Sequence, residues 1–210
     1  MSNNWDLDSL ADHLTIVQGK RRRIIAIAGA PGAGKSTFAE ALQRVLRERL
    51  NCEVLPMDGF HYDDTVLNVL GLRARKGAPQ TFDIGGFAAT LKRLSEDDGR
   101  EVAVPVFDRS IEIARAGARI IGPEARLILV EGNYLLLNDP DWVLLRKFFN
   151  ETVFLKVREP VLEKRLYARW EAFGLPEEEI RSKLEANDLL NASLVLRSSG
   201  TADIYIANNG

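Results

Sequence analysis

The chain has 210 residues, of which 46% are hydrophobic and 28% are charged, which predicts one folded domain with a substantial core and excludes a disordered segment. Its 28 basic and 30 acidic side chains give a net charge of −2 and argue against a protein that binds mainly nucleic-acid phosphates. The single cysteine, Cys52, excludes an internal disulfide framework and a cysteine-rich zinc site.

Along the chain, short apolar strands alternate with helical patterns, as is typical of a parallel α/β sheet covered by helices. The first half predicts a helix from Leu7 to Val17 that ends at Gly19, then a strand at 23–28, a helix at 36–50, a strand at 53–57 and a helix at 84–95. The second half predicts strands at 126–131, 152–157 and 203–207, and helices at 141–149, 160–173 and from Pro176 onward. Residues 101–121 do not fit this alternation and are predicted to form a hairpin outside the main sheet.

The segment at 29–36 reads GAPGAGKS and matches the phosphate-binding pattern G-x-x-x-x-G-K-S, between a predicted buried strand and a predicted amphipathic helix. Successive backbone N–H groups of such a loop point into one concavity at a helix N-terminus and bind phosphate oxygens. Lys35 is expected to reach the β- and γ-phosphates, and the Ser36 hydroxyl to coordinate Mg²⁺. The alternative is a glycine-rich turn that ends in a lysine by chance. The expected nucleotide-binding residues are Gly29, Ala30, Pro31, Gly32, Ala33, Gly34, Lys35, Ser36 and Thr37.

Besides the Ser36 hydroxyl, a P-loop protein needs a carboxylate that helps to hold the metal, at the end of a neighbouring buried strand. Glu131 follows the apolar run at 127–130 and is expected to supply it, with Gly132 allowing the chain to turn away. The alternative is an edge carboxylate that faces solvent, which the four consecutive apolar residues argue against.

The P-loop alone does not identify a reaction, because GTPases and motor ATPases share it. The segment at 83–86 reads DIGG and formally matches the D-x-x-G of GTPase switches, but it does not follow a buried strand, and the sequence has no N-K-x-D element. Asp58 ends the second predicted strand, where carboxyl ends of parallel strands face the ligand crevice. It is expected to accept the proton of a substrate hydroxyl or to hold water on the metal. The alternative is that it only caps a helix beginning near Asp63.

A P-loop, an aspartate at the end of the second strand and a strand-E-G segment together resemble the superfamily of uridine kinase, phosphoribulokinase and pantothenate kinase. The resemblance extends over nearly the whole chain and implies a sheet in the strand order 2-3-1-4-5. The segment at 72–83 resembles the K-x-G-x-P-x-x-[FY]-D segment of pantothenate kinases, and the segment at 105–108 resembles the P-x-Y-D segment of uridine kinases. Glu112 stands about where uridine kinases have a histidine, which argues against uridine.

The combination is most similar to the bacterial group of fructose transport system kinases, whose name indicates a sugar. The resemblance places a substrate-side insertion at about 59–121. The expected substrate-binding residues are Asp58, His61, Lys76, Phe82, Asp108 and Asn187. Alternatively, the basic loop at 73–76 is solvated, the aromatic rings only pack, and Asn187 and Asn191 only bind backbone. These amides are expected to lie on a buried stripe through Ile180, Leu184 and Leu194.

A lid is expected at about residues 158–175, because related kinases have a mobile segment there. The spacing of apolar residues in its helix predicts a buried stripe, made of Leu162, Leu166, Trp170 and Phe173. Arg165 and Arg169 lie one turn apart on the flank, where guanidinium groups suit a transferred phosphoryl group. The alternative is ordinary solvated charge.

The sequence therefore predicts a kinase that uses ATP and Mg²⁺ to phosphorylate a hydroxyl of a small metabolite, first a sugar, then a pantothenate-like alcohol or a nucleoside. Asp58, Lys35, Arg165 and Arg169 are the expected catalytic residues, and Ser36 and Glu131 the expected metal ligands. A nucleotide-binding interaction protein, or a slow ATPase without an acceptor site, is the alternative. No apolar run approaches the roughly 20 residues that span a bilayer, and the acidic start is no secretion signal. We expect a cytoplasmic protein with no membrane or nucleic-acid partner, and a homodimer is compatible with the sequence.

Overall fold

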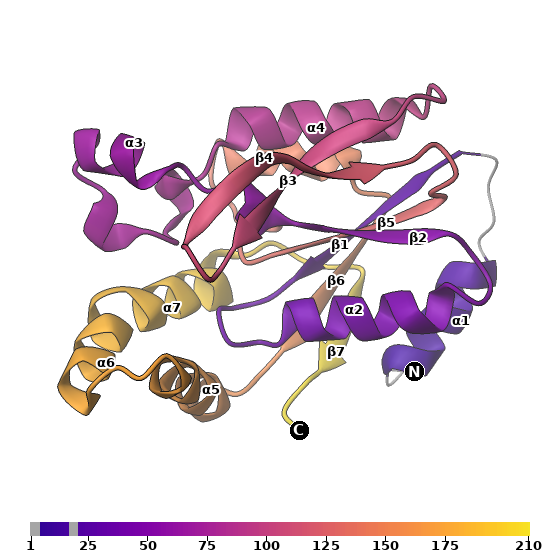
Figure 1. Cartoon of the computed structure of the whole chain (residues 1–210). Helices are drawn as coiled ribbons and strands as arrows, with labels where there is room; N and C mark the ends of the chain where they lie inside the picture. Colours follow the sequence, from indigo (N-terminus) through magenta and orange to yellow (C-terminus); the bar gives the residue numbers. More distant parts are fainter. Residues whose placement is uncertain (1–4, 17–20) are drawn as a thin grey trace.

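The computed structural model describes residues 5–16 and 21–210. A parallel sheet of five strands forms its centre (Figure 1). In spatial order the strands are β2 (Cys52–Pro56), β5 (Leu127–Gly132), β1 (Arg23–Ala28), β6 (Glu151–Lys156) and β7 (Ile204–Ala207). Numbered along the chain without the separate hairpin, this is the expected order 2-3-1-4-5. β1 and β5 are paired up to Ala28 opposite Gly132, so both carboxyl ends reach the same edge of the sheet.

Helices cover both faces of this sheet, which explains why its central strands are apolar. Every residue of β5 is buried, as is all of β1 after Arg23. α1 (Leu7–Ile16) and α2 (Lys35–Leu46) lie on one face and α4 (Ile84–Glu96) on the other (Figure 1). The remaining helices gather toward the end where the strands finish: α3 (Asp64–Val69), α5 (Glu159–Ala172), α6 (Glu177–Lys183) and α7 (Leu189–Ser198). None of the helices described is long and apolar enough to cross a membrane.

The predicted hairpin is confirmed as an antiparallel pair outside the main sheet, β3 (Val102–Asp108) with β4 (Ile113–Ile121). Its register shifts between Val104 and Val106, at Pro105, which has no backbone N–H to donate. The hairpin lies against the short 3₁₀ helix at Met57–Phe60 that follows β2. A Cβ added to Gly59 would lie 2.7 Å from the carbonyl oxygen of Pro105, so only glycine allows this approach.

Three details of the predicted helices are wrong. The helix predicted at 36–50 ends at Leu46, where turn bonds to the Leu46 carbonyl replace it. The segment predicted as a helix at 141–149 is a 3₁₀ helix, Trp142–Phe148. Its buried residues, Trp142 and Leu145, are three apart, the spacing that a 3₁₀ helix aligns. Phe173 is 52% exposed because it follows the last residue of α5, so the helical stripe does not reach it.

The stripe predicted through Leu194 is also wrong, for a different reason. A π-helical turn, Leu184–Asp188, joins α6 to α7 and takes up more residues per turn than an α-helix. Asn191 is buried as predicted, but the buried positions on either side of it lie one residue later than predicted, at Asp188 and Val195, and Leu194 is exposed. Val17 and Gly19, predicted to end the first helix, lie outside the described residues.

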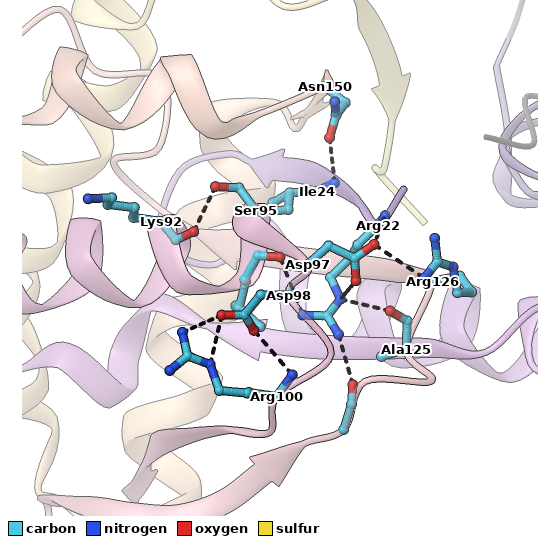
Figure 2. A network of polar contacts seen from close by, with 12 residues as sticks. Arg22, Ile24, Lys92, Ser95, Asp97, Asp98, Arg100, Ala125, Arg126 and Asn150 are labelled. Carbon is cyan, nitrogen blue, oxygen red and sulfur yellow. Dashed lines mark hydrogen bonds and ion pairs between the residues drawn. The ribbon is translucent and has the colours of Figure 1, made fainter. Parts of the chain in front are cut away.

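A buried arginine joins three segments at the end of the sheet where the strands begin (Figure 2). Arg22, just before β1, donates side-chain hydrogen bonds to the carbonyl oxygens of Ala125, Leu94 and Gly122. Its backbone N–H donates to Asp97, which ends α4 in the left-handed conformation and lies 3.7 Å from the Arg22 guanidinium. The Arg22 side chain is 1% exposed, so the guanidinium depends on these partners in place of water.

Replacing Arg22 with methionine should therefore destabilise the fold strongly. The change removes the guanidinium from three carbonyl oxygens and from Asp97, which keeps only Arg126 and the backbone N–H of residue 22 among these contacts. Each buried acceptor left without a donor typically costs about 1–3 kcal/mol. The free energy of unfolding in urea measures the loss. Arg100→Met is the matched control, because the Arg100–Asp98 pair lies on the surface and should not contribute measurably. Equal stability of the two variants would contradict the assigned role.

Candidate functional site

The P-loop joins β1 to α2, at the edge where the central strands end. Gly32 and Gly34 take the left-handed conformation, with φ of 80° and 79°, which glycine adopts at little cost. The Ala33 N–H donates to the Ala30 carbonyl and closes the loop. Lys35 begins α2, and its buried ammonium donates to the same Ala30 carbonyl at 2.9 Å. The sequence-predicted strand, loop and helix are thus all present in the expected order.

Glu131 lies beside the start of α2, within the last two residues of β5. It is 5% exposed, so the alternative of a solvent-facing edge carboxylate is wrong. The Ser36 hydroxyl donates to Glu131 Oε1 at 3.0 Å. A hydroxyl and a carboxylate oxygen at this distance are the donor types that Mg²⁺ takes when a nucleotide supplies further ligands. Among the described residues, no group of three or more His, Cys, Asp or Glu could hold a metal by itself.

Burial moves both charged groups of this site toward neutrality. It lowers the pKa of Lys35 to about 8, although Glu131 and Asp58 oppose the shift. Burial, with a smaller contribution from the charge of Asp58, raises the pKa of Glu131 to about 7, although Lys35 and the Ser36 hydrogen bond oppose the shift. The cause in both cases is the loss of water around a charge.

Asp58 lies in the 3₁₀ helix directly after β2, close enough to influence both buried charges. Its carboxylate forms an ion pair of 2.7 Å with Arg109, the first residue after β3. It does not cap the next helix, because Asp63 does so by accepting from the Thr65 N–H. The capping interpretation of Asp58 is therefore wrong.

His61 forms one wall next to Asp58. Its Nδ1 lies 2.8 Å from the Asp58 carbonyl oxygen, and burial lowers its pKa. Its ring is 4.0 Å from the ring of Phe82 and 4.9 Å from that of Phe107. Phe82 is only 3% exposed and also packs edge-on against Tyr134 and Trp142. Its ring thus lies behind His61, as support.

The basic loop after α3 is held by acidic and amide partners. Lys76 Nζ contacts Asp64 Oδ1 and the Glu112 carbonyl oxygen, each at 2.6 Å. Asn187 donates to the Lys76 carbonyl at 2.8 Å, and Asn191 donates to Asn187. Asn187 thus makes the backbone contact of the structural alternative, with a segment far away in the sequence, whereas the Asn191 amide hydrogen-bonds the side chains of Asn187 and Arg75.

Two aspartates of interest make local turn contacts. Asp108 accepts from the N–H and hydroxyl of Ser110 and lies 3.6 Å from Arg115. Asp83 accepts from the Gly86 N–H and caps α4, so the D-x-x-G match is a helix start.

The segment at 158–175 lies against the P-loop. Arg165 donates to the carbonyl oxygens of Gly32 at 3.4 Å and of Gly210 at 2.9 Å. The Arg169 guanidinium lies 5.0 Å from the centre of the Trp170 ring. Its positive charge helps to lower the pKa of Lys35. A contact that the sequence did not indicate joins the end of the chain to the loop, where Asn208 donates to the Ala33 carbonyl at 2.7 Å.

Next to this region, a cavity of about 430 Å³ lies at the carboxyl ends of β6 and β7. Phe154 and Tyr205 contribute aromatic rings, and Lys156 and Arg158 contribute positive charge. Lys156 Nζ lies 4.0 Å from the centre of the Tyr205 ring. The cavity is thus apolar with basic groups at its wall, a lining suited to a flat ring that carries an anionic tail.

Comparison with known proteins gives one consistent family. The model of the phosphoribulokinase / uridine kinase family matches residues 24–167. A Schizosaccharomyces pombe protein named "Putative uridine kinase" is 34% identical over 200 residues, which cover 91% of this chain and 85% of that protein. A pantothenate kinase of Enterococcus faecalis is 31% identical over 153 residues, 71% of this chain and 50% of that longer protein. The crystal structure of a "putative fructose transport system kinase" from a Silicibacter species has a TM-score of 0.90 and 38% identity, and the match covers 96% of this chain and 98% of that chain.

Replacing Glu131 with glutamine should change how the stability of the ligand-free protein depends on pH. Folded Glu131 keeps its proton to about pH 7, whereas the unfolded chain loses it near the ordinary value of 4.5. The folded state therefore binds more protons in this window, and the stability that Glu131 contributes falls as the pH rises through it. We expect wild type to lose on the order of 2 kcal/mol relative to Glu131→Gln between these limits. Urea unfolding at pH 5, 6 and 7 measures it, and parallel curves would contradict it.

Proposed function

Because the chain belongs to the phosphoribulokinase / uridine kinase family of small-molecule kinases, we propose that it transfers the γ-phosphoryl group of Mg-ATP to a hydroxyl of a sugar or sugar derivative. The observation that carries the acceptor step is the position of Asp58. Its carboxylate follows β2 and shares one charged cluster with Lys35 and Glu131. The name of the Silicibacter neighbour supports a sugar as the first acceptor. Pantothenate-like alcohols and nucleosides are the next acceptors to consider, because the names of the other relatives indicate them.

The P-loop is the proposed phosphate site. The backbone N–H groups of residues 29–37, apart from Pro31, which has none, would bind the phosphates, and Lys35 would exchange the Ala30 carbonyl for the β- and γ-phosphate oxygens. Ser36 and Glu131 hold Mg²⁺, whose charge would offset that of the phosphates. Glu131 gives up its proton to do so, because a cation favours the ionised carboxylate.

Asp58 is the proposed base that orients the acceptor hydroxyl and accepts its proton. His61 and Lys76 line the same proposed acceptor side as Asp58, and Phe82 supports the His61 ring. Asp108 lies at the end of β3 in the hairpin. Asn187 holds the loop that carries Lys76, and so acts through it. Phosphoryl transfer depends mainly on position and electrostatics, so a hydroxyl held in line matters as much as proton removal.

The segment at 158–175 is the proposed lid. Arg165 already contacts a P-loop carbonyl, and Arg169 lies one turn further along α5. Both guanidinium groups are placed to neutralise the transferred phosphoryl group when the lid closes. Gly174, the next-to-last residue of the segment, has a φ of 76° and allows the chain to turn there.

A coupled assay of ADP release with sugars, nucleosides and pantothenate tests the proposal. ADP release that depends on one acceptor class supports a kinase. ADP release that is equal with and without every acceptor would identify a slow ATPase, and Lys35→Ala should abolish release in either case.

Asp58→Asn should lower kcat with little change in ATP affinity. Asparagine is nearly isosteric but cannot accept the proton, and the loss of a general base typically costs about 10²–10⁴-fold. Turnover, ATP affinity and melting temperature are measured on the same sample. Asp63→Asn is the control, because asparagine caps a helix almost as well as aspartate. Near-normal turnover of Asp58→Asn would remove this residue from the mechanism.

The lid makes a conformational prediction. Amide protons of residues 158–175 should exchange more slowly when a non-hydrolysable ATP analogue and the best acceptor of the assay are both bound, because closure excludes water. Hydrogen exchange followed by mass spectrometry measures the effect, with α1 as the internal reference. Equal protection in the free and bound protein would leave Arg165 and Arg169 as surface charge.

A further inference from the structure

Arg109 occupies one oxygen of the carboxylate that the acceptor hydroxyl needs. Its Nη2 donates to Asp58 Oδ2 at 2.7 Å, so both oxygens of Asp58 are open to the acceptor only when the guanidinium moves away. On the basis of the proposed function, we propose that the acceptor carries an oxyanion, a carboxylate or a phosphate, and that this group takes Arg109 over from Asp58. Arg109 is then a residue that determines acceptor specificity.

The charges around Arg109 favour this exchange. Lys76 and Arg109 lie near the same Phe107 ring, at 5.5 and 5.9 Å from its centre. Lys76 keeps its contact with Asp64, a carboxylate that it shares with Arg73, whatever Asp58 does. Within the described structure, the one ion-pair partner of Arg109 is Asp58, the proposed base for the acceptor hydroxyl.

Opening the Asp58–Arg109 ion pair costs little free energy, but leaving Arg109 without a negative partner costs more. The Arg109 side chain is 50% exposed, and an ion pair this accessible contributes little stability, so a ligand can open it. Once the guanidinium has left Asp58, however, Arg109 adds an uncompensated positive charge near Lys35, Lys76 and Arg169. An oxyanion on the acceptor restores the balance and can bind the planar guanidinium through two hydrogen bonds.

His61 narrows the acceptor class further. Its Nδ1 faces the Asp58 carbonyl oxygen, which can only accept, so Nδ1 carries the hydrogen and Nε2 keeps a lone pair. Among the described residues Nε2 has no hydrogen-bond partner, and it can accept a second hydroxyl. A carboxylate, a lone pair and a cation side by side fit a polyhydroxylated oxyanion, such as a sugar acid or a sugar phosphate.

Matched pairs of acceptors test the proposal: gluconate with glucitol, pantothenate with panthenol, and fructose 6-phosphate with fructose. In wild type, kcat/KM for the anion should exceed that for its neutral partner at least about tenfold in one pair, and the pair identifies the oxyanion as carboxylate or phosphate. Arg109→Gln should remove the preference by raising KM for the anion, and Arg109→Lys should restore part of it. Arg100→Gln, the same charge change on an exposed side chain, should leave it unchanged.

Three outcomes would overturn the proposal. These are equal use of both members of every pair by wild type, an unchanged preference in Arg109→Gln, or weaker ATP binding in Arg109→Gln with the preference kept. The last would place Arg109 on the nucleotide phosphates.

A second measurement does not depend on turnover. With a non-hydrolysable Mg-ATP analogue filling the P-loop, the Nε–H NMR signal of Arg109, assigned by its loss in Arg109→Gln, should shift with malonate and not with equimolar glycerol. No shift overturns the specificity role. A shift without any acceptor turnover leaves the anion site standing and contradicts the proposed kinase reaction instead.

Discussion

Lys35 and Glu131 are buried together at the edge where the two central strands end, and the rest of the site is arranged about this pair. A buried charge is costly without a partner, and both groups shift toward neutrality in response. The Ser36 hydroxyl compensates part of the cost at Glu131, and the Ala30 carbonyl and the charge of Asp58 compensate part of it at Lys35, whereas Asp58 adds to the cost at Glu131. A ligand that brings an anion to Lys35 and a cation to Glu131 completes the compensation, which is why a metal-bound nucleotide suits this edge.

The acceptor side depends on one close packing contact. Gly59 lets the hairpin approach the 3₁₀ helix after β2, and this approach brings Arg109 within reach of Asp58. A side chain at position 59 would push the two segments apart, because its Cβ would meet the Pro105 backbone. The hairpin therefore contributes side chains to the proposed acceptor side. It supplies Phe107 and Arg109, which the P-loop alone does not provide.

The fold and the phosphate site could be predicted because their signals are local. An apolar strand, a glycine-rich loop and an amphipathic helix follow one another directly, and the hairpin shows itself as a break in the alternation. The Asp58–Arg109 pair and the Asn208–Ala33 contact join residues 51 and 175 positions apart, which no spacing indicates. Helix periodicity failed where the backbone left α geometry: the π turn at Leu184–Asp188 shifted the buried stripe from Leu194 to Val195.

That π turn also connects the two sides of the site. Trp170 of α5 donates to Asp188 at 2.6 Å, and the preceding residue, Asn187, holds the Lys76 carbonyl. The widened turn keeps Asp188 buried against Trp170 while Asn187 reaches the loop. α5, which carries the proposed lid arginines, and the loop that carries Lys76 thus share one support, in the segment whose periodicity the sequence predicted least well.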